Sequence, residues 1–257
     1  VPQESGKGTV EDFVHHGGDA FVMDITTQTA ALASDDATVK LLGEQRGVFF
    51  TGGDQSRITA VFRSSGGTTP GLLALRQVLA QGGVIAGTSA GAAMMSDPMI
   101  TGGNSEEALT SGVLTLDDRG VGVGPGMGFF PYGITDQHFL RRGRLGRLIV
   151  ACEATSQTFG FGVEENTALD VDLASDSVTA IGQRGFLFVD LRGASHQGQS
   201  RSGVRISLLG AGDAVHGRTG LVTLAAGKQP LQVAAVPGDA PSPGEDAWGR
   251  HVIPKMI

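Results

Sequence analysis

The chain has 257 residues, of which 40% are hydrophobic and 18% charged, a balance typical of a globular protein and not of a disordered one. The net charge of −7 argues against general nucleic-acid binding, which normally needs a basic surface. The single cysteine, Cys152, excludes a disulfide within the chain, and no apolar run approaches the ~18 residues of a membrane-spanning helix.

Helix and strand patterns alternate in the first part of the chain. Weak helical character at residues 10–14 precedes a strand pattern at 20–25 and a helical pattern at 27–46. Further along are a buried strand at 47–51 that runs into Gly52-Gly53, a helix around 72–79 that ends at Gly82-Gly83, a buried strand at 84–86 and a helix at 90–95. This alternation predicts an α/β fold with a mostly parallel sheet and helices on both faces.

The pattern becomes β-rich after residue 155. Short strand candidates separated by Gly, Asp and Ser occur at 159–163, 168–171, 178–181, 186–191, 204–209 and 221–224. From residue 237 a segment rich in Pro, Gly and Ser is typical of a loop or mobile tail. We therefore expect a single α/β domain over residues 1–236 and a tail over 237–257.

A candidate nucleophile lies between the strand at 84–86 and the helix at 90–95. The segment Gly87-Thr88-Ser89-Ala90-Gly91 fits the pattern G-x-S-x-G. A serine on a sharp strand-to-helix turn projects its hydroxyl away from the backbone, and the helix start offers free N–H groups to an oxyanion. Because glycine is frequent in this chain, the alternative that Ser89 is an ordinary helix N-cap stays open at this point.

A nucleophilic serine needs a base and an acid that orients the base. Among the six histidines, His138 stands out because it lies in the polar segment Thr135-Asp136-Gln137-His138 and is followed by four arginines within seven residues, Arg141, Arg142, Arg144 and Arg147. Arginines in this number indicate a local anion site, since the guanidinium fork suits carboxylates. The alternative is a solvated helix face with dispersed charges.

Five segments in this order resemble the cyanophycinase family of serine peptidases, family S51, over roughly residues 1–191. They are Phe50-Thr51-Gly52-Gly53-Asp54-Gln55, Gly87-Thr88-Ser89-Ala90-Gly91-Ala92-Ala93, Asp136-Gln137-His138-Phe139, Arg142-Gly143-Arg144-Leu145-Gly146-Arg147-Leu148 and Gly162-Val163-Glu164-Glu165-Asn166-Thr167-Ala168-Leu169. The resemblance implies a class I glutamine-amidotransferase-like three-layer α/β sandwich.

The resemblance also implies the roles of the site residues. Ser89 would be the nucleophile, His138 the general base and acid, and Glu165, the second acid of the Glu164-Glu165 pair, the group that orients His138. This Ser-His-Glu order differs from the order Ser-Asp/Glu-His of α/β-hydrolases, which argues against a generic esterase. The backbone N–H groups of Gly53 and Ala90 would stabilise the oxyanion.

The implied substrate is cyanophycin, a poly-aspartate with arginine on each side-chain carboxyl, and the product a β-Asp-Arg dipeptide. The carboxylates of the attached arginines could bind Arg142, Arg144 and Arg147, and their guanidinium groups could bind Gln55, Asp136 and Gln137. Alternatively, Asp136 and Gln137 could hold the loop that presents His138. The resemblance implies a homodimer, and no sequence pattern for a metal or an organic cofactor is found.

Two other functions remain possible from the sequence. One is an aspartyl or isoaspartyl dipeptidase of the same family, which would have less need for the whole arginine set. The other is a non-catalytic binder of acidic polymer on the same fold.

Members of the family begin with a strand and a Gly-Gly turn that would lie ahead of Val1. The dipeptide Val1-Pro2 resembles the end of the second strand of that fold. We therefore expect either a removed leader or a fragment that lacks N-terminal strands, and the compartment, cytoplasmic or secreted, stays open.

Overall fold

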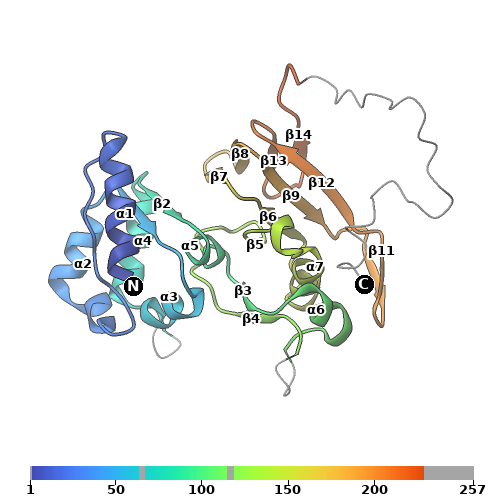
Figure 1. Cartoon of the computed structure of the whole chain (residues 1–257), viewed down its shortest axis with the longest axis horizontal. Helices are drawn as coiled ribbons and strands as arrows, with labels where there is room; N and C mark the ends of the chain where they lie inside the picture. The colour runs from blue at the N-terminus through green and yellow to red at the C-terminus, as the bar shows by residue number, and fades with distance from the viewer. Residues whose placement is uncertain (1, 64–66, 115–118, 229–257) are drawn as a thin grey trace.

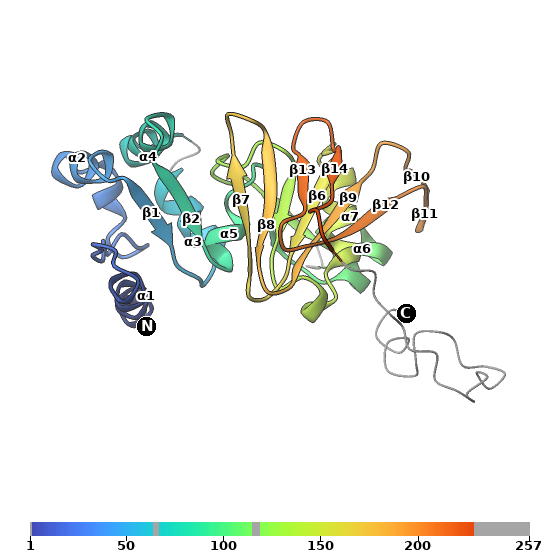
Figure 2. The ribbon, with the colours of Figure 1, turned by 90° about the horizontal axis from the view of Figure 1, so that it is seen from above.

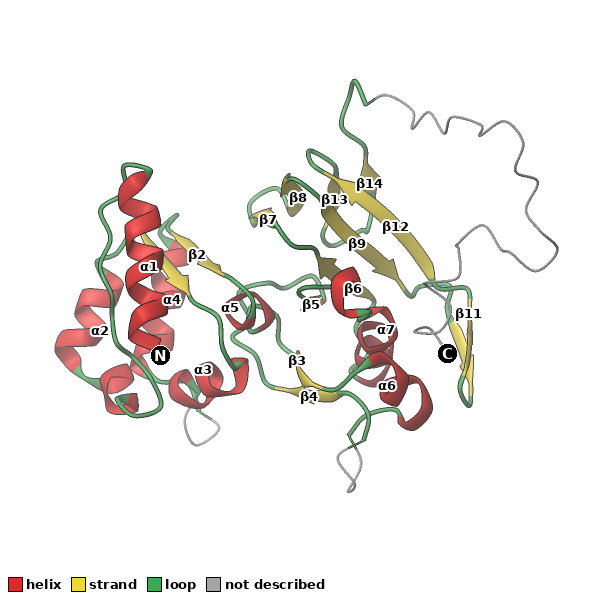
Figure 3. Cartoon of the chain, in the orientation of Figure 1, coloured by secondary structure: helices red, strands yellow, loops and turns green. Residues whose placement is uncertain are grey.

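The computed structural model describes residues 2–63, 67–114 and 119–228, with the side chains of residues 2–5 left aside (Figure 1). Helices α1 to α4, within residues 2–80, lie in the N-terminal half, and most strands lie in the C-terminal half together with α6 and α7, within residues 105–154 (Figure 3). Within these described ranges no helix is both long enough and apolar enough to cross a membrane.

The helices alternate with the first strands of the chain. The α-helices are α1 (Pro2–His15), α2 (Asp36–Gly43), α3 (Gln55–Phe62), α4 (Pro70–Ala80), α5 (Ala90–Ala93), α6 (Ser105–Ser111) and α7 (Leu145–Ala154). The 3-10 helices are η1 (Ala30–Ser34) and η3 (Leu140–Arg142).

Short strands make up most of the second half. The strands are β1 (Gly47–Phe50), β2 (Val84–Gly87), β3 (Met99–Gly102), β4 (Gly122–Gly124), β5 (Ile134–Asp136), β6 (Phe159–Val163), β7 (Thr167–Asp172), β8 (Ser177–Gly182), β9 (Gly185–Asp190), β10 (Ser195–Gln197), β11 (Ser200–Ser202), β12 (Arg205–Gly210), β13 (Ala214–His216) and β14 (Val222–Thr223).

The N-terminal half is built on the parallel pair β1–β2, in which Phe50 pairs with Gly87. Side chains from α2, α3 and α4 form one core with Val48, Phe50 and Ile85 of this pair. The other face is less covered, and there Phe13 of α1 makes an edge-to-face contact with Phe49. Figure 2 shows α2 and α4 on one side of the strand pair and α1 on the other.

Three predictions for the N-terminal half need correction. The predicted helix at 27–46 is divided into η1 and α2, because the side chain of Asp35 accepts a hydrogen bond from Thr38 N–H and caps α2. The predicted strand at 20–25 is wrong, since Met23 and Ile25 pack on the core without pairing to a strand. Pro2 is the first residue of a helix and does not end a strand, and Val1 lies outside the described residues.

The C-terminal half consists of two stacked four-stranded sheets and a helical layer. The inner sheet has the order β12-β9-β6-β5, and the outer sheet β14-β13-β8-β7. Strand β9 is buried throughout its length, with Phe186 and Phe188 in the core between the sheets. Leu187 and Val189 point to the opposite core, which contains Leu148 and Ile149 of α7. The layers are therefore helices, sheet and sheet.

The α/β class is confirmed, but the prediction of a mostly parallel sheet is wrong. Among the described strands only the pairs β1–β2 and β5–β6 form parallel ladders, and the remaining ladders are antiparallel. Short connections such as 173–176 between β7 and β8 can join only antiparallel neighbours. Residues 237–257 lie outside the described residues, so the predicted domain boundary at 236 stays a prediction.

Candidate active site

Ser89 lies on a strained turn between β2 and α5. Its φ of 52° and ψ of −113° lie outside the regions that non-glycine residues usually occupy. The flanking glycines make this turn possible. A Cβ on Gly87 would lie 2.5 Å from the Gly91 oxygen, and a Cβ on Gly91 would lie 2.2 Å from the Phe50 oxygen. The structure therefore needs both glycines of the G-x-S-x-G pattern.

His138 and Glu165 follow two neighbouring strands. Strands β5 and β6 are parallel, with Asp136 opposite Gly162, so their carboxyl ends lie at one edge of the inner sheet. His138 is the second residue after β5 and has a φ of 50°, and Glu165 is the second residue after β6. Helix α5, which carries Ser89 at its start, lies between β2 and β5 (Figure 1).

The three side chains form one hydrogen-bonded chain. Ser89 Oγ lies 2.9 Å from His138 Nε2, and His138 Nδ1 lies 2.7 Å from Glu165 Oε1. An ionised carboxylate only accepts hydrogen bonds, so Nδ1 carries the proton that faces Glu165. In the neutral ring Nε2 is then an acceptor, and the Ser89 hydroxyl donates to it. This is the arrangement that a serine nucleophile and its base require.

The surroundings of Glu165 favour its ionised form. The hydrogen bond from His138 is the main cause that lowers the pKa of this carboxyl below its usual value. Desolvation opposes this effect, whereas the electrostatic interactions with His138, Arg141 and Arg142 lower the pKa further. About 29% of the Glu165 side chain and 22% of the His138 side chain are exposed, so both groups can be reached from solvent.

The side chain of Glu164 binds the backbone of Leu140 and not the His138 ring. This side chain is buried and its Oε1 accepts a hydrogen bond from the backbone N–H of Leu140. The structure thus places Glu165, and not Glu164, against the His138 ring, as the family resemblance implies. The contact between Glu164 and Leu140 was not anticipated from the sequence, where an adjacent pair of acids was its only signal.

The Gly52-Gly53 turn lies beside the nucleophile. A Cβ on Gly52 would lie 3.4 Å from Ser89 Cβ, and Gly53 has a φ of 131°. Within the described ranges neither Gly53 N–H nor Ala90 N–H donates to a backbone carbonyl. Ala90 directly follows Ser89 and Gly53 directly follows Gly52, so both N–H groups stay predicted oxyanion donors.

Asp136 and Arg147 bind each other. Asp136 is 1% exposed and Arg147 5% exposed. Arg147 Nε lies 2.7 Å from Asp136 Oδ2 and Nη2 lies 2.5 Å from Oδ1, while Nη1 donates to the Gly103 oxygen at 2.7 Å. Because both side chains are buried and paired, we correct the prediction that they contact substrate. Asp136 thus agrees with the alternative that it holds the segment that presents His138. The alternative for the arginines, a solvated helix face, does not apply to the buried Arg147.

Arg144 is also largely engaged within the protein. Its Nη1 donates to the Gln137 oxygen at 2.6 Å and to the Gln137 side-chain oxygen. Burial lowers the pKa of Arg144 to about 10, partly offset by the charge of Asp136. Gln55 donates from its side-chain amide to the Ile100 oxygen at 2.8 Å. The predicted contacts with substrate thus compete with contacts already made by Gln55, Gln137 and Arg144.

Arg142 differs from the other predicted arginines because it is exposed. It lies in η3, next to the equally exposed Arg141, and both charges act on Glu165. No cluster of three or more His, Cys, Asp or Glu side chains able to hold a metal ion occurs in the part of the chain that the structure describes.

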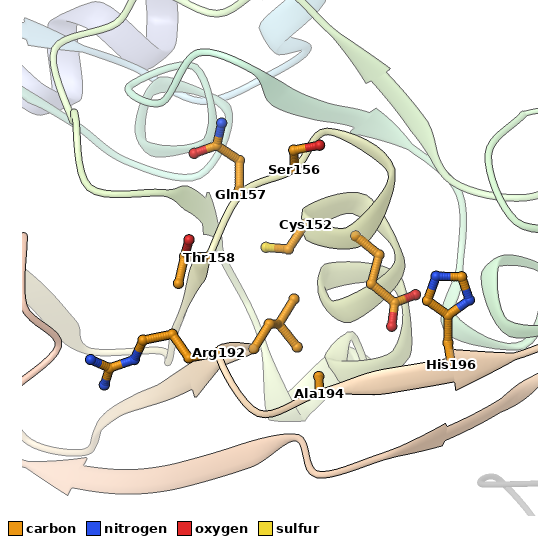
Figure 4. Close-up of a pocket in the computed structure, with 9 residues that line it drawn as sticks. Cys152, Ser156, Gln157, Thr158, Arg192, Ala194 and His196 are labelled. Carbon is orange, nitrogen blue, oxygen red and sulfur yellow. The ribbon is translucent and has the colours of Figure 1, made fainter.

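A hollow of about 310 Å³ lies elsewhere, at the C-terminal end of α7 (Figure 4). It is lined by residues that include Cys152, Gln157, Arg192 and His196, and not by Ser89, His138 or Glu165. The geometry at Ser89 therefore identifies the candidate active site better than the size of a hollow does.

The sequence matches the profile of peptidase family S51 over residues 1–177. This range includes Ser89, His138 and Glu165. The chain belongs to peptidase family S51. The match ends at Ser177, where β8 begins, so the S51 profile does not extend over β9 to β14.

Similar proteins support this S51 assignment. A cyanophycinase from Synechococcus elongatus is 32% identical over 197 residues, which are 73% of this chain and 58% of that protein. A cyanophycinase from Trichormus variabilis is 34% identical over 180 residues, 66% of this chain and 56% of that protein. The chain therefore spans less than two thirds of the length of these relatives.

A solved structure shares the fold. It is the crystal structure of a peptidase from an acI-B1 Actinobacterium, with a TM-score of 0.56, 18% sequence identity and coverage of 80% of this chain and 72% of the other. At this identity the similarity concerns the fold alone.

Proposed function

We propose that this chain is a serine peptidase that hydrolyses cyanophycin to β-Asp-Arg dipeptides through an acyl-enzyme on Ser89. The observation that carries the proposal is the hydrogen-bonded chain from Ser89 Oγ through His138 to Glu165, with distances of 2.9 and 2.7 Å. Membership of family S51 and the similarity to cyanophycinases support it. The class I glutamine-amidotransferase-like arrangement is part of the same proposal.

The first step is acylation of Ser89. His138 Nε2 accepts the hydroxyl proton while Oγ attacks an aspartyl carbonyl carbon of the substrate. Glu165 stabilises the imidazolium that forms, because its carboxylate accepts from Nδ1. The negative oxygen of the tetrahedral intermediate binds the N–H groups of Gly53 and Ala90, and one such donor contributes about 10²–10³ in rate.

The second step releases the products. His138 gives its proton to the leaving amine, and the acyl group stays on Ser89. A water molecule, deprotonated by His138, then attacks the ester carbonyl carbon. As the bond from this carbon to Oγ breaks, His138 returns the proton to Ser89 and the carboxylate product is released. The residues of this chain supply every proton acceptor and donor that these steps need.

Substrate binding rests mainly on Arg142. It is exposed and close enough to Glu165 to act on its carboxyl electrostatically, and it can bind a carboxylate of an attached arginine. Arg144, Gln137 and Gln55 can contribute if substrate displaces the hydrogen bonds that their side chains make within the protein.

We also propose the homodimer implied by the family resemblance, which light scattering of the purified chain can test.

The test is incubation with purified cyanophycin, with dipeptide release followed by mass spectrometry. We expect release of β-Asp-Arg by the parent and none by Ser89→Ala. A matched control is Ser175→Ala, which removes an exposed serine hydroxyl that donates to Asp172 in the turn between β7 and β8. Ser175→Ala should retain activity. Equal release by the parent and by Ser89→Ala would contradict the role of Ser89.

A second candidate is an aspartyl or isoaspartyl dipeptidase. A dipeptidase would have less need for the whole set Arg142, Arg144 and Arg147 as substrate ligands. This objection is weaker in the folded protein, because Arg147 is paired with Asp136 and Arg144 with Gln137. If the folded parent releases nothing from cyanophycin, hydrolysis of α-aspartyl and isoaspartyl dipeptides would support this candidate. Binding of cyanophycin without hydrolysis of either substrate would instead support the non-catalytic binder.

A further inference from the structure

The backbone at His138 is held in an uncommon conformation. Its φ of 50° is in the left-handed region, and glycine, which would adopt it freely, does not occupy the position. Such strain persists only where the surrounding structure fixes it. The contacts on either side of His138 therefore bear directly on where its ring lies.

The end of β6 fixes the residues that follow His138. Phe139 N–H donates to the Val163 oxygen at 3.2 Å, and the buried Phe139 ring lies against Gly162. Leu140 N–H donates to the Glu164 carboxylate. The next residue, Glu165, accepts from His138 Nδ1. Three consecutive residues of one segment thus hold three consecutive residues of the other.

Gln137, the residue before His138, is held by an arginine just before helix α7. Arg144, which directly precedes α7, donates from Nη1 to both the backbone oxygen and the side-chain oxygen of Gln137. The chain therefore has a charged anchor one residue before His138 and a second one two residues after it. One is a guanidinium and the other a carboxylate, and among the described residues the hydrogen bond of Ser89 Oγ is to His138.

From this arrangement we infer that Glu164 and Arg144 are positioning residues that clamp His138 in its left-handed conformation, with Nε2 aimed at Ser89. The inference rests on the proposed function, because it gives His138 the role of base. The two acids of the Glu164-Glu165 pair then have separate tasks. Glu165 orients the imidazole ring, and Glu164 orients the backbone that carries the ring.

The experiment measures how fast Ser89 reacts with a fluorophosphonate probe, which needs the base but no particular peptide substrate. Intact-mass spectrometry of the 257-residue chain gives the rate constant. We expect Glu164→Ala to lower it about 10–100-fold, because a displacement near 1 Å at a catalytic group has an effect of this size. Glu164→Gln should restore most of the rate, since its amide oxygen accepts the same N–H.

A matched control is Glu153→Ala, which removes a partly buried glutamate whose partner is Arg201 at 2.8 Å. It should change thermal stability without slowing the labelling of the folded fraction. If Glu164→Ala does not fold, Arg144→Met tests the other anchor, with the same expected loss. Labelling of folded Glu164→Ala, or of Arg144→Met in its place, at the parental rate would overturn the inference.

These results separate the inference from the proposed function. A parent whose Ser89 does not react at all contradicts the proposed function and, with it, the basis of the inference. A reactive parent with equally reactive anchor variants contradicts the inference alone. A reactive parent that releases no β-Asp-Arg, together with slow Glu164→Ala, contradicts the choice of substrate and supports the clamp.

Discussion

Ser89 and His138 both have positive φ angles, but only one of them carries a signal for this in the sequence. The glycines of the G-x-S-x-G segment marked the turn at Ser89, because residues without a side chain are needed where the backbones of β1 and α5 approach. His138 has no adjacent glycine. Its conformation depends on hydrogen bonds from Arg144 and to Glu164, which lie six and 26 residues away in the sequence.

A substitution at Gly91 tests whether the close approach of the Ser89 turn to the backbone of Phe50 requires glycine. We expect Gly91→Ala to lower the free energy of unfolding by about 1–3 kcal/mol, because the new Cβ would lie 2.2 Å from the Phe50 oxygen. It should also slow probe labelling of Ser89. Urea unfolding gives the first quantity. The control is Gly102→Ala, where a Cβ meets no atom within 4 Å, and equal stability of the two variants would contradict the argument.

Glu165 gives a prediction for pH. Its pKa is lowered mainly by the hydrogen bond from His138, so the carboxylate stays ionised as the pH falls through the range where an ordinary Glu takes up a proton. Carboxyl carbon NMR should show this low pKa. In His138→Ala the titration should move back up toward the ordinary value of about 4.3. An unchanged titration in that variant would mean that the arginines, and not His138, cause the shift.

At the scale of elements, the pairing of the parallel strands β5 and β6 brings His138 and Glu165 together. The order of the strands along the chain predicts neither which strands pair nor that His138 and Glu165 follow neighbouring ones. Helix α7 adds the support, since Arg147 near its start reaches back to Asp136 at the end of β5. The arginine-rich segment was predicted to bind anions from substrate, but part of it binds the protein's own Asp136.

The pair Asp136–Arg147 yields a prediction at this scale. Removing one partner leaves a buried charge, so Asp136→Ala or Arg147→Met should each lower the free energy of unfolding by about 3–5 kcal/mol. The double variant should recover much of this loss. Urea unfolding of the single and double variants measures the coupling.

The matched control for this pair is the exposed pair Lys40–Glu44, where Lys40→Ala should change stability by less than about 1 kcal/mol. If Asp136 and Arg147 instead served substrate binding, their replacement would raise KM and leave the unfolding free energy unchanged.

At the scale of the whole molecule, the residues of the candidate active site come from two halves that have separate hydrophobic cores. Ser89 belongs to the half built on β1–β2, whereas His138 and Glu165 belong to the half built on the stacked sheets. Helix α5 lies between these halves in both views (Figures 1 and 2). The distance of 2.9 Å between Ser89 Oγ and His138 Nε2 therefore depends on how the halves pack.

The stacked sheets should make the protein sensitive to acid. Hydrogen bonds from Arg192 and from Tyr132 lower the pKa values of Asp190 and Asp176, respectively. A carboxyl whose pKa is lower in the folded state stabilises the fold above the ordinary Asp value of about 3.9, and this contribution is lost as the pH falls through the lowered value. Urea midpoints should therefore fall below about pH 4.

Asp190→Asn is the variant that checks this acid sensitivity. It should be less stable than the parent at pH 7 and should lose less stability between pH 5 and pH 3, because one carboxyl no longer titrates. A parallel decline of both proteins would show that Asp190 does not contribute.

The sequence by itself determined the family, the nucleophile turn and most of the short strands after residue 155, because each depends on residues that are adjacent in the chain. It also supplied Ser89, His138 and Glu165 in order, through the resemblance to a known family. Only the tertiary structure decided how the strands pair, which acid of the Glu164-Glu165 pair faces His138, and which arginines remain exposed. These outcomes depend on contacts between segments far apart in the sequence, where the pairing partner of a charge is set by packing and burial.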